Sequence, residues 1–527
     1  MVKDLRTTAV QLKLTRRPAL ETSPWGLLNA QPFFPSLETL FKTETVSNLS
    51  EYGIKLSEEV ESILDARHIK TTKGRTVPVH RKTTMILSPF KWMRGDYSAL
   101  PLPKPEEIAE DVHGTLQSPH TAGYVGALTS IVLSESECLH FPKVFGVYVG
   151  LADRHTIDIS EDYEDLSERK WFGDNIGKTF ELKLRTTADT PEFSHTRGQR
   201  PGVALGEEIA LDGIEDIVAD HVSEPSSRSH EEDAESGTTD EDFEPDSEEE
   251  DDDEFEIQSC DCESEEGDDE EESEGEEDDA PFAWATFRNA PVITTVMEEC
   301  EGTFYDLLEK DSAPEKHVAW VAQMVFALAY AQRTYGFTHN DLHGDNVMYI
   351  STPQEFLYYK HNGTCYRIPT YGVLLKIIDF DRAITSVRLL GMKEPRQFVS
   401  SQFRSGDEAA GQYNLDPFKV QERPHIAPNP SFDLCRFATS TYWSLPPEHP
   451  LRPVFREWMT QSDGTSVLLR AGKDPEDEHE RYHGFDLYKA IARYCKDSAT
   501  PRRELAKLTM FQIPTTPVGT PCLFIES

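Results

Sequence analysis

The chain has 527 residues, more than one small domain holds, which predicts two to four units or one large enzyme with insertions. Ninety-five acidic residues against 52 basic ones give a formal net charge of −43, but 31 of the acidic residues lie between Glu231 and Asp279, where no Lys or Arg occurs. The rest of the chain carries 64 acidic and 52 basic residues, which argues against a basic surface that binds nucleic acid directly.

Three features bear on cellular location. The longest apolar stretches fall far short of the ~20 residues that a membrane span needs. Residues 1–20 lack the apolar core of a secretory signal. The eight cysteines are scattered, without a CxxC pair or the spacing of zinc ligands. We therefore expect an intracellular protein with reduced thiols, neither secreted nor bound to a membrane.

The part of the chain before the acidic run alternates between strand-like and helix-like patterns, after residues 1–75, which are mixed and stay unassigned. The apolar and β-branched runs predict strands, and the longer periodic runs predict helices. The expected strands are Thr76–Lys82, Met85–Met93 and Phe141–Gly150, and the expected helices are Glu106–Leu116 and His120–Ser134.

The acidic run, taken as residues 223–280, consists mostly of Asp, Glu, Ser and Gly. A segment with so few apolar residues cannot bury enough surface to offset the entropy of ordering, so we expect it to be disordered and extended. It is either a solvated spacer or a surface that attracts basic proteins such as histones or capsid proteins.

The pattern after the acidic run is sharper. Asn362-Gly363 lies between two strand-like runs and predicts a hairpin over Phe356–Arg367. The remaining expected elements, in chain order, are a buried strand Ala290–Glu298, a helix beginning at Phe304, a mostly buried helix Glu315–Tyr335, an apolar strand Val373–Phe380 and a helix Phe485–Tyr494.

Two short segments carry the chemistry. The first is THNDLHGDNV, residues 338–347, directly after the buried helix; the second is IIDFD, residues 377–381, at the end of a strand. Together they supply Asp341, then Asn346 five residues later, then Asp379 at a strand end. This order matches the HxDxxxxN and DFG motifs of protein kinases.

Phosphoryl transfer from ATP explains this set of residue types. The reaction needs an aligned acceptor and cations over the phosphates. Asp341 would orient the acceptor hydroxyl and accept its proton as the catalytic base. Asn346 and Asp379 would bind Mg²⁺, which prefers hard oxygen ligands together with substrate phosphates. The expected ligands are therefore ATP and Mg²⁺.

The chain from about Thr76 to Ser440, apart from the acidic run, resembles protein kinases, and in more detail the serine/threonine kinases of nucleocytoplasmic large DNA viruses, particularly iridovirus-like ones. Besides the two motifs, the matching segments are VHRKTTMILSPFKWMRGDY, HTAGYVGALTS, DISEDYEDL, EGTFYDLL, YYKHNGTCYRIPTYG and NPSFDLCRFATS. The resemblance implies an α+β, bilobal protein-kinase-like fold with a small, mainly β N-lobe and a larger, mainly α C-lobe. The implied division is an N-lobe with insertions (76–222), the acidic linker (223–280), the end of the N-lobe and hinge (281–303), the C-lobe (304–440) and a C-terminal helical part (441–527). A viral source would place the protein in the host cytoplasm or the virion.

The resemblance also implies roles for single residues. Lys82 would contact the α and β phosphates, with Lys91 as its competitor. The hinge would offer adenine the backbone groups of Glu298, Glu299 and Cys300, and Met297 would form the rear wall or simply pack in the core. His343 would bond the γ-phosphate or pack within its loop, and Asp433 would hold the backbone of the catalytic loop or cap a helix.

Several departures from the kinase pattern leave alternatives open. No Gly-rich GxGxxG loop precedes Lys82, and Gly74 is the only nearby glycine. The helix that should supply an acidic partner for Lys82 has no acid, which leaves Glu106, Glu107 and Glu110 as candidates. Asn340 replaces the usual Arg, and Asp381 replaces the Gly of DFG. The first expectation is a kinase acting on Ser/Thr hydroxyls of proteins; the alternatives are a small-molecule phosphotransferase of the same fold and a pseudokinase scaffold that binds basic proteins.

Overall fold

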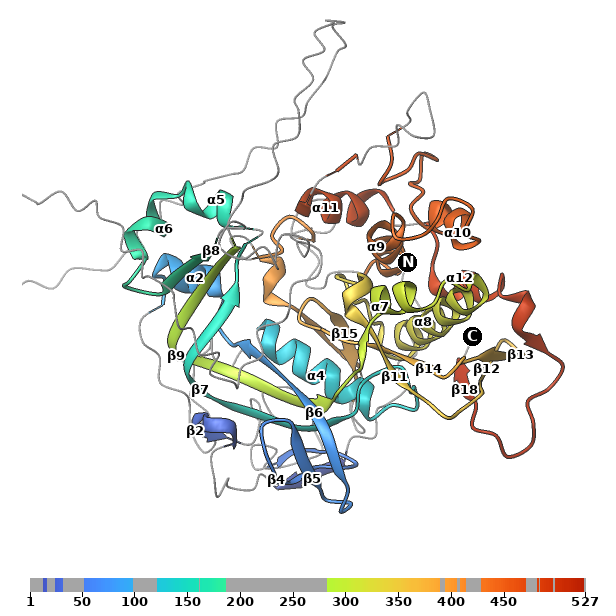
Figure 1. The fold of residues 1–527 in the computed structure, drawn as a ribbon, viewed down its shortest axis with the longest axis horizontal. Helices are drawn as coiled ribbons and strands as arrows, with labels where there is room; N and C mark the ends of the chain where they lie inside the picture. Colours follow the sequence, from blue (N-terminus) through green and yellow to red (C-terminus); the bar gives the residue numbers. More distant parts are fainter. Residues whose placement is uncertain are drawn as a thin grey trace, which may run out of the picture. The chain divides into compact units, whose positions relative to one another are not determined.

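The computed structural model describes residues 13–16, 24–31, 52–97, 121–160, 162–185, 282–388, 394–404, 408–413, 428–470, 481–482, 484–495 and 498–525. These residues form both helices and mainly antiparallel sheets, so the expected α+β class is confirmed (Figure 1). The acidic run and the expected helix Glu106–Leu116 lie outside the described residues.

The largest sheet is antiparallel and has the order β2-β7-β9-β6-β5-β4, with β8 paired to β9. Its strands are β2 (Leu28–Gln31), β4 (Val60–Ile63), β5 (His68–Thr71), β6 (Thr76–Met85), β7 (Val144–Asp158), β8 (Glu181–Arg185) and β9 (Phe282–Glu298). In the centre of the sheet, Lys82 of β6 lies opposite Thr295 of β9. Residues opposite each other project to the same face, and so do residues two apart. Lys82, Thr84 and Met297 therefore share one face.

The segment after β6 corrects one expectation. Met85–Met93 is not a strand, because β6 ends at Met85 and helix α2 (Pro89–Arg94) follows. The Ser88 side chain caps the helix, Pro89 begins it, and Gly95 ends it with a φ of 92°. A capping Ser, a Pro in the first turn and a Gly after the last are strong helix signals, and they outweigh the apolar character of the run.

Helix α4 (Ala122–Ser134) packs on the sheet against β6, β7 and β9 (Figure 1). It begins close to the expected position and is buried along almost its whole length. Its residues Val125, Leu128 and Val132 belong to the same apolar cluster as Ile293 of β9 and Phe326 of helix α8 (Pro314–Tyr335). One continuous core therefore connects the large sheet, α4 and α8.

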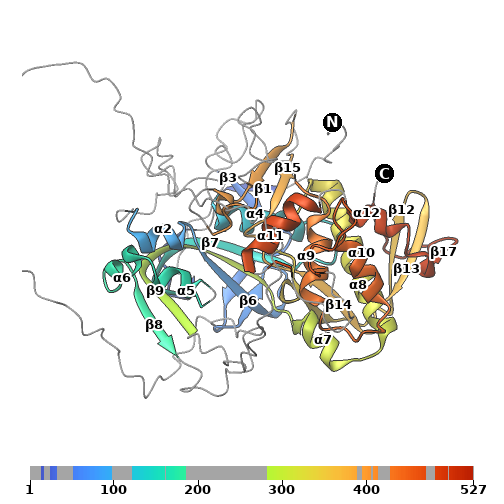
Figure 2. The same ribbon diagram turned by 90° about the horizontal axis from the view of Figure 1, so that it is seen from above.

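Helix α8 is the centre of a helical group formed with the C-terminal part of the chain (Figure 2). It contacts α12 (Pro501–Leu505), while α9 (Phe432–Thr441) contacts both α10 (Leu451–Trp458) and α11 (Gly484–Tyr494). Nearly every residue of α8 from His317 to Gln332 is buried, as the periodicity predicted for Glu315–Tyr335. The helix expected at Phe485–Tyr494 is also confirmed, as α11.

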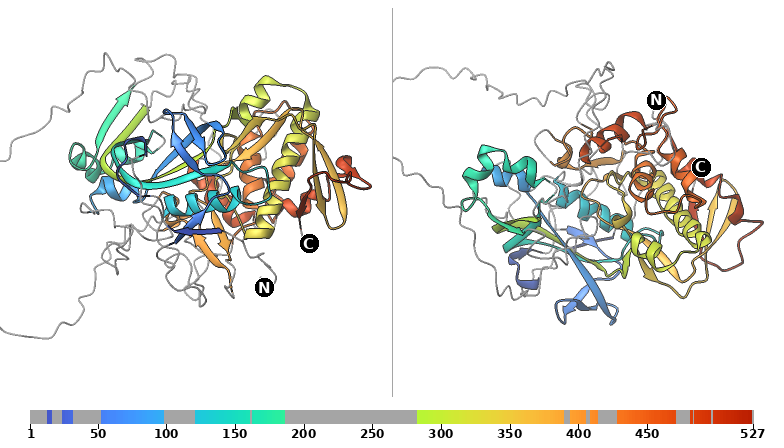
Figure 3. Two further views of the ribbon diagram at one scale, coloured as in Figure 1. Left: turned by 90° about the horizontal axis from the view of Figure 1, so that it is seen from below. Right: turned by 45° about the horizontal axis from the view of Figure 1, so that its top comes forward.

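Besides the pair formed by β1 (Lys13–Arg16) and β3 (Tyr52–Lys55), three smaller sheets complete the described part. The first has the order β10-β11-β14, with β10 (Gly302–Thr303), β11 (Val347–Ser351) and β14 (Val373–Ile377). The expected hairpin is confirmed as β12 (Phe356–His361) and β13 (Thr364–Pro369), with Asn362 and Gly363 at φ 48° and 83°. The C-terminal strands β17 (Gln512–Ile513) and β18 (Leu523–Ile525) extend this hairpin (Figure 3). The third sheet pairs β15 (Ile384–Val387) with β16 (Arg396–Val399).

The segment 186–281 begins and ends at neighbouring strand ends. Arg185, the last residue of β8, pairs with Phe282, the first residue of β9. The β8–β9 ladder then continues to Glu181 and Thr286. The described residues on either side of this segment, Arg185 and Phe282, are therefore held side by side by the β8–β9 pairing. Among the described helices, none has the length and apolar character of a membrane span.

Candidate active site

The two chemistry-bearing segments meet because β11 and β14 are paired. Val347, directly after Asn346, lies opposite Ile377, two residues before Asp379. The Ile378 N–H donates to the Asn346 carbonyl at 3.0 Å. On the other side of the loop, Thr338 and Ile384 exchange two backbone hydrogen bonds of 3.0 Å. These pairings bring together the ends of two loops that lie more than 30 residues apart in the sequence.

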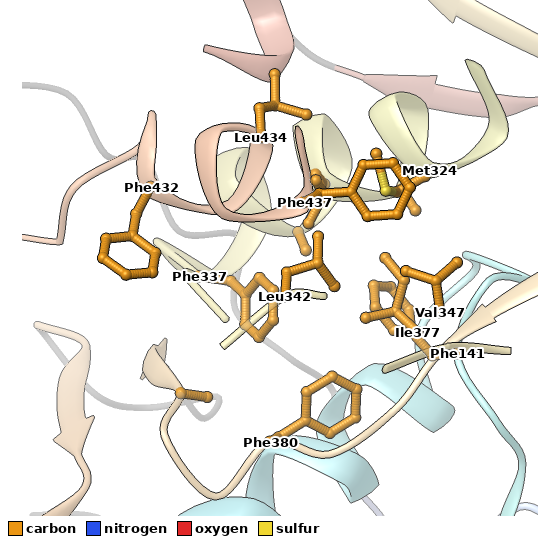
Figure 4. Close-up of a cluster of buried hydrophobic side chains, with 14 of the residues drawn as sticks. Phe141, Met324, Phe337, Leu342, Val347, Ile377, Phe380, Phe432, Leu434 and Phe437 are labelled. Carbon is orange, nitrogen blue, oxygen red and sulfur yellow. The ribbon is translucent and has the colours of Figure 1, made fainter. Parts of the chain in front are cut away.

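An apolar layer lies beneath both loops (Figure 4). Leu342, next to Asp341, is fully buried, and Phe380, next to Asp379, is almost fully buried. The Phe380 ring lies 5.9 Å from the Phe337 ring and 6.1 Å from the Phe141 ring, centroid to centroid. Each acidic residue is thus joined to a neighbour anchored in the core, which fixes its backbone.

Asp433 of α9 holds the backbone of the first loop, as expected. Its carboxylate accepts the His339 N–H through both oxygens at 3.0 Å and the Asn340 N–H through Oδ1 at 2.9 Å. The side chain is fully buried, and burial raises the pKa of Asp433 to about 7, although the two N–H donors act in the opposite direction.

Asn340 has a left-handed backbone conformation, with φ 65°. Asn tolerates this region better than most residues other than Gly. Its buried side chain donates to the Arg382 carbonyl at 2.8 Å and accepts the Tyr413 hydroxyl at 2.8 Å. Asn340 therefore joins its own loop to the segment after Asp381.

The Asp341 carboxylate is bonded by groups that the motifs did not reveal. The Tyr488 hydroxyl of α11 donates to Asp341 Oδ1 at 2.6 Å, and Arg382 Nη1 lies 3.6 Å from Asp341 Oδ2. The Arg436 guanidinium lies 4.7 Å from the Tyr488 ring centroid. Burial would raise the pKa of Asp341, but the charges of Arg382 and Arg436 and the Tyr488 hydrogen bond outweigh it and hold the pKa well below its ordinary value. Asp341 is therefore an anion at neutral pH.

Asn346 and His343 lie together in the same loop. The Asn346 amide nitrogen donates to the Asp341 carbonyl at 2.8 Å and lies 3.0 Å from His343 Nε2. His343 Nδ1 lies 3.4 Å from an Asp345 carboxylate oxygen. Both ring nitrogens of His343 are thus engaged inside the loop, which favours the loop-packing interpretation over a bond to a γ-phosphate. The Asn346 amide is oriented by its nitrogen, which leaves its oxygen as the group suited to a cation.

Lys82 lies between two carboxylates. Its Nζ is 2.5 Å from Asp379 Oδ1 and 2.8 Å from Asp381 Oδ2. Lys91, the competing candidate, lies on α2. Burial would raise the pKa of Asp379, but the Lys82 charge and hydrogen bond hold it below its ordinary value, and the charge of Asp341 acts against them. The backbone hydrogen bond from Ile378 to Asn346 joins the loop of Asp379 to the loop of Asp341.

The residues expected to meet adenine end β9 and follow it. Met297 is buried and lies opposite His80 of β6. The Glu298 N–H donates to the Lys143 carbonyl at 2.8 Å, and the Glu298 carboxylate lies 2.8 Å from Nζ of the buried Lys376. Since the Glu298 N–H already donates to another part of the protein, an adenine ring would have to bond other backbone groups of the connector that follows β9. Cys300 lies two residues further on, and burial raises the pKa of its thiol to about 12.

The β4–β5 turn, one turn earlier than the turn that leads into the Lys82 strand, contains no glycine. The four residues between β4 and β5 are Leu64-Asp65-Ala66-Arg67, and the Asp65 carboxylate accepts the N–H groups of Arg67 and His68 at 2.7 and 2.8 Å. Gly74, at φ 76°, lies in the next turn, between β5 and β6. The backbone N–H groups of Arg67 and His68 are therefore already bonded to the Asp65 side chain, and they are not left for a phosphate.

The described residues contain no group of three or more His, Cys, Asp or Glu side chains arranged to hold a metal ion. Mg²⁺ is usually bound through one or two protein oxygens together with substrate phosphates. The Asn346 amide oxygen and the Asp379 carboxylate, 42% exposed, fit this kind of site.

Sequence reasoning missed Arg382, Tyr488 and Arg436. Arg382 directly follows IIDFD and could have been noticed as the cation nearest the motif; the other two approach Asp341 only through the packing of α9 and α11. The candidate acidic partners of Lys82, Glu106, Glu107 and Glu110, lie outside the described part of the chain. No protein-family model matches the chain, and no curated protein matches it.

Proposed function

We propose that the protein is a Mg·ATP-dependent kinase with a bilobal, protein-kinase-like fold that transfers the γ-phosphoryl group to Ser or Thr hydroxyls of proteins. The observation that carries the proposal is the convergence of Lys82, Asp341, Asn346 and Asp379, which come from three separate stretches of the chain.

The order of elements supports the proposal. The Lys82 strand and the strand leading to the connector are adjacent in one antiparallel sheet, and a helix packs on the face that carries Lys82. The loop with Asp341 follows a buried helix, and the Asp379 loop follows the strand paired to β11. The same order of parts serves phosphoryl transfer in protein kinases.

In the proposed reaction the acceptor oxygen forms a bond to the γ-phosphorus, the bond to the β–γ bridging oxygen breaks, and ADP leaves. Asp341 accepts the hydroxyl hydrogen bond and then the proton. Because Arg382 and Tyr488 keep Asp341 ionised, its main contribution is orientation, and a positioned base is worth about 10²–10⁴ in rate. Lys82 supplies a cation to the α and β phosphates.

Asn346 and Asp379 would hold Mg²⁺, which would neutralise charge on the phosphates when bound. Asn346 is oriented by the Asp341 carbonyl, so the metal ligand and the base are fixed by one hydrogen bond. The left-handed backbone of Asp379, φ 62°, turns its carboxylate toward Lys82.

A small-molecule phosphotransferase of the same fold is the second candidate. The aromatic residues Phe485 and Tyr488 of α11 stack at a centroid distance of 5.4 Å, and Tyr488 touches Asp341 directly. Aromatic side chains this close to the base would narrow the acceptor side, which suits a small alcohol. A scaffold that only binds basic proteins through residues 223–280 would not need the charged set at Asp341 and Asp379.

A side-by-side assay separates the candidates. Purified protein with Mg²⁺ and labelled ATP is offered histone, a Ser/Thr peptide library and a panel of small alcohols. The proposal expects phosphate on Ser or Thr, and a loss of about 10²–10⁴-fold in Asp341→Ala. Transfer to alcohols alone would favour the second candidate, and an Asp341→Ala protein as active as the wild type would refute both.

A further inference from the structure

Lys82 has a second carboxylate partner that the metal site does not use. Asp381 Oδ2 lies 2.8 Å from Lys82 Nζ and also accepts the Thr84 hydroxyl at 3.1 Å. The Asp381 side chain is 17% exposed, against 42% for Asp379. Of the two acids, Asp381 is thus the more enclosed, and β6 bonds it through two residues on one face.

Helix α4 has a glycine, Gly126, at the position where it contacts the Asp381 carboxylate. A Cβ built on Gly126 would lie 2.0 Å from Asp381 Oδ1, 3.2 Å from its Cγ and 3.4 Å from its Cα. Every residue other than Gly would collide with Asp381 at this position. Glycine inside a helix is destabilising relative to alanine, so its presence in the middle of α4 is explained by the space that Asp381 fills.

The helix offers Lys82 no acid of its own. Its sequence, AGYVGALTSIVLS, contains neither Asp nor Glu. Glu135, just after its end, lies 2.8 Å from Lys143 and accepts the Ser57 N–H at 3.1 Å. In protein kinases a glutamate of the helix that packs on this sheet pairs with the strand lysine. Here the place facing Lys82 from the helix side is occupied by Asp381.

We infer that Asp381 is the positioning residue for Lys82, and that it replaces a helix acid by entering the space left open at Gly126. This inference rests on the proposed function. If Asp379 is committed to the metal, Asp381 remains as the anion that holds the Lys82 ammonium toward the phosphates. The ion pair between Lys82 and Asp381 is then formed by β6 and the segment after β14, and it does not need an acidic residue on α4.

Relocation of the carboxylate tests the inference. Asp381→Asn keeps the shape and removes the charge, and we expect kcat/KM for ATP to fall about 10- to 100-fold, the factor that a hydrogen bond to a charged group is worth. The kcat/KM of Asp381→Gly for ATP should fall by at least the same factor. The double variant Asp381→Gly/Gly126→Asp returns a carboxylate to the same space from the helix, and should recover at least tenfold over Asp381→Gly. Gly126→Ala should lose activity, because its methyl group displaces Asp381.

Gly123→Ala is the matched control. It is also a helix glycine, but the three nearest neighbours of its added methyl group would be Ile293 Cγ2 at 2.6 Å, the Met85 carbonyl oxygen at 3.5 Å and Thr84 Cγ2 at 3.6 Å, with no atom of Asp381 among them. We expect it to keep the wild-type kcat/KM. Thermal melting shows that each variant is folded; if Asp381→Asn does not fold, Gly126→Ala and the double variant carry the comparison.

A second readout needs no catalysis. Lys82 Nζ enclosed by carboxylates should acylate slowly with an amine-reactive ester, measured by mass spectrometry, then faster in Asp381→Asn and slowly again in the double variant. Unchanged kcat/KM and unchanged Lys82 labelling in Asp381→Asn would overturn the inference. A wild-type protein without phosphotransfer would overturn the proposed function instead, and the labelling series would still decide whether Asp381 holds Lys82.

Discussion

Replacing Asp433 should weaken the folded protein and the site together. Asp433→Ala leaves the buried N–H groups of His339 and Asn340 without their acceptor. An unsatisfied buried donor costs about 1–3 kcal/mol, so the two together lower the free energy of unfolding by about 2–6 kcal/mol. Asp433→Asn should cost less, since the oxygen at Oδ1 alone accepts from both groups.

The stability that Asp433→Ala loses relative to the wild type should depend on pH, and the direction of this dependence follows from the pKa of Asp433. Burial raises the pKa of Asp433 from 3.8 to about 7, so the folded protein holds this proton more tightly than the unfolded chain. The resulting stability is present below about pH 4 and is lost as the pH rises to 7. At 1.36 kcal/mol per pH unit of difference in pKa, the wild type loses about 2–3 kcal/mol of this contribution between pH 5 and 8. Because Asp433→Ala has no such contribution, its deficit should shrink by that amount at pH 8.

Urea unfolding at pH 5 and pH 8 measures the stability cost of Asp433→Ala and its change with pH. Hydrogen exchange at the His339 and Asn340 amides measures the same effects at the loop itself. Phosphotransfer should fall along with the exchange protection, because these two residues precede Asp341. A cost of less than about 1 kcal/mol at pH 5 in Asp433→Ala, or a deficit that grows toward pH 8, would refute the reasoning.

Three further changes have defined outcomes. Tyr488→Phe removes a hydrogen bond that helps to hold the pKa of Asp341 down, so the acidic limb of the kcat/KM profile should move to higher pH; an unmoved limb contradicts this. Lys376→Met leaves the partly buried Glu298 carboxylate unpaired and should cost about 1–3 kcal/mol in thermal or urea unfolding, partly recovered by adding Glu298→Gln. Deletion of residues 223–280 should leave peptide phosphorylation unchanged but weaken binding to histone at low salt, and equal binding at all ionic strengths would show that the acidic run is only a spacer.

Local patterns predicted the elements whose signals lie within a few residues. The periodicity of α8 and the Asn362-Gly363 turn each specify their structure without help from the rest of the chain. The prediction of a strand at Met85–Met93 is wrong for a local reason as well, because the capping signals of Ser88 and Gly95 determine the structure more strongly than the apolar run between them. The strand at Ala290–Glu298 extends back to Phe282, because its first half pairs with β7 and β8.

The parts of the site that could not be predicted depend on contacts between distant segments. The motifs gave Asp341, Asn346 and Asp379, because their order along the chain reflects the pairing of β11 with β14. The residues that contact these three do not lie at a fixed spacing from them in the sequence. Tyr488 reaches Asp341 across 147 positions of sequence. The contact of His343 with Asn346 is likewise a feature that the order of the motifs did not indicate.

The four residues from Asp379 to Arg382 connect three electrostatic interactions. Asp379 and Asp381 face Lys82, and Arg382 faces Asp341, while Phe380 between them is anchored against Phe337 and Phe141. A Gly at position 381 would leave the turn freer to rearrange, whereas the Asp present here is bonded to β6 and enclosed by α4. Since one short, anchored turn positions Lys82 and also keeps Asp341 ionised, these interactions form or fail together. The charged set is therefore expected to be assembled before any ligand binds.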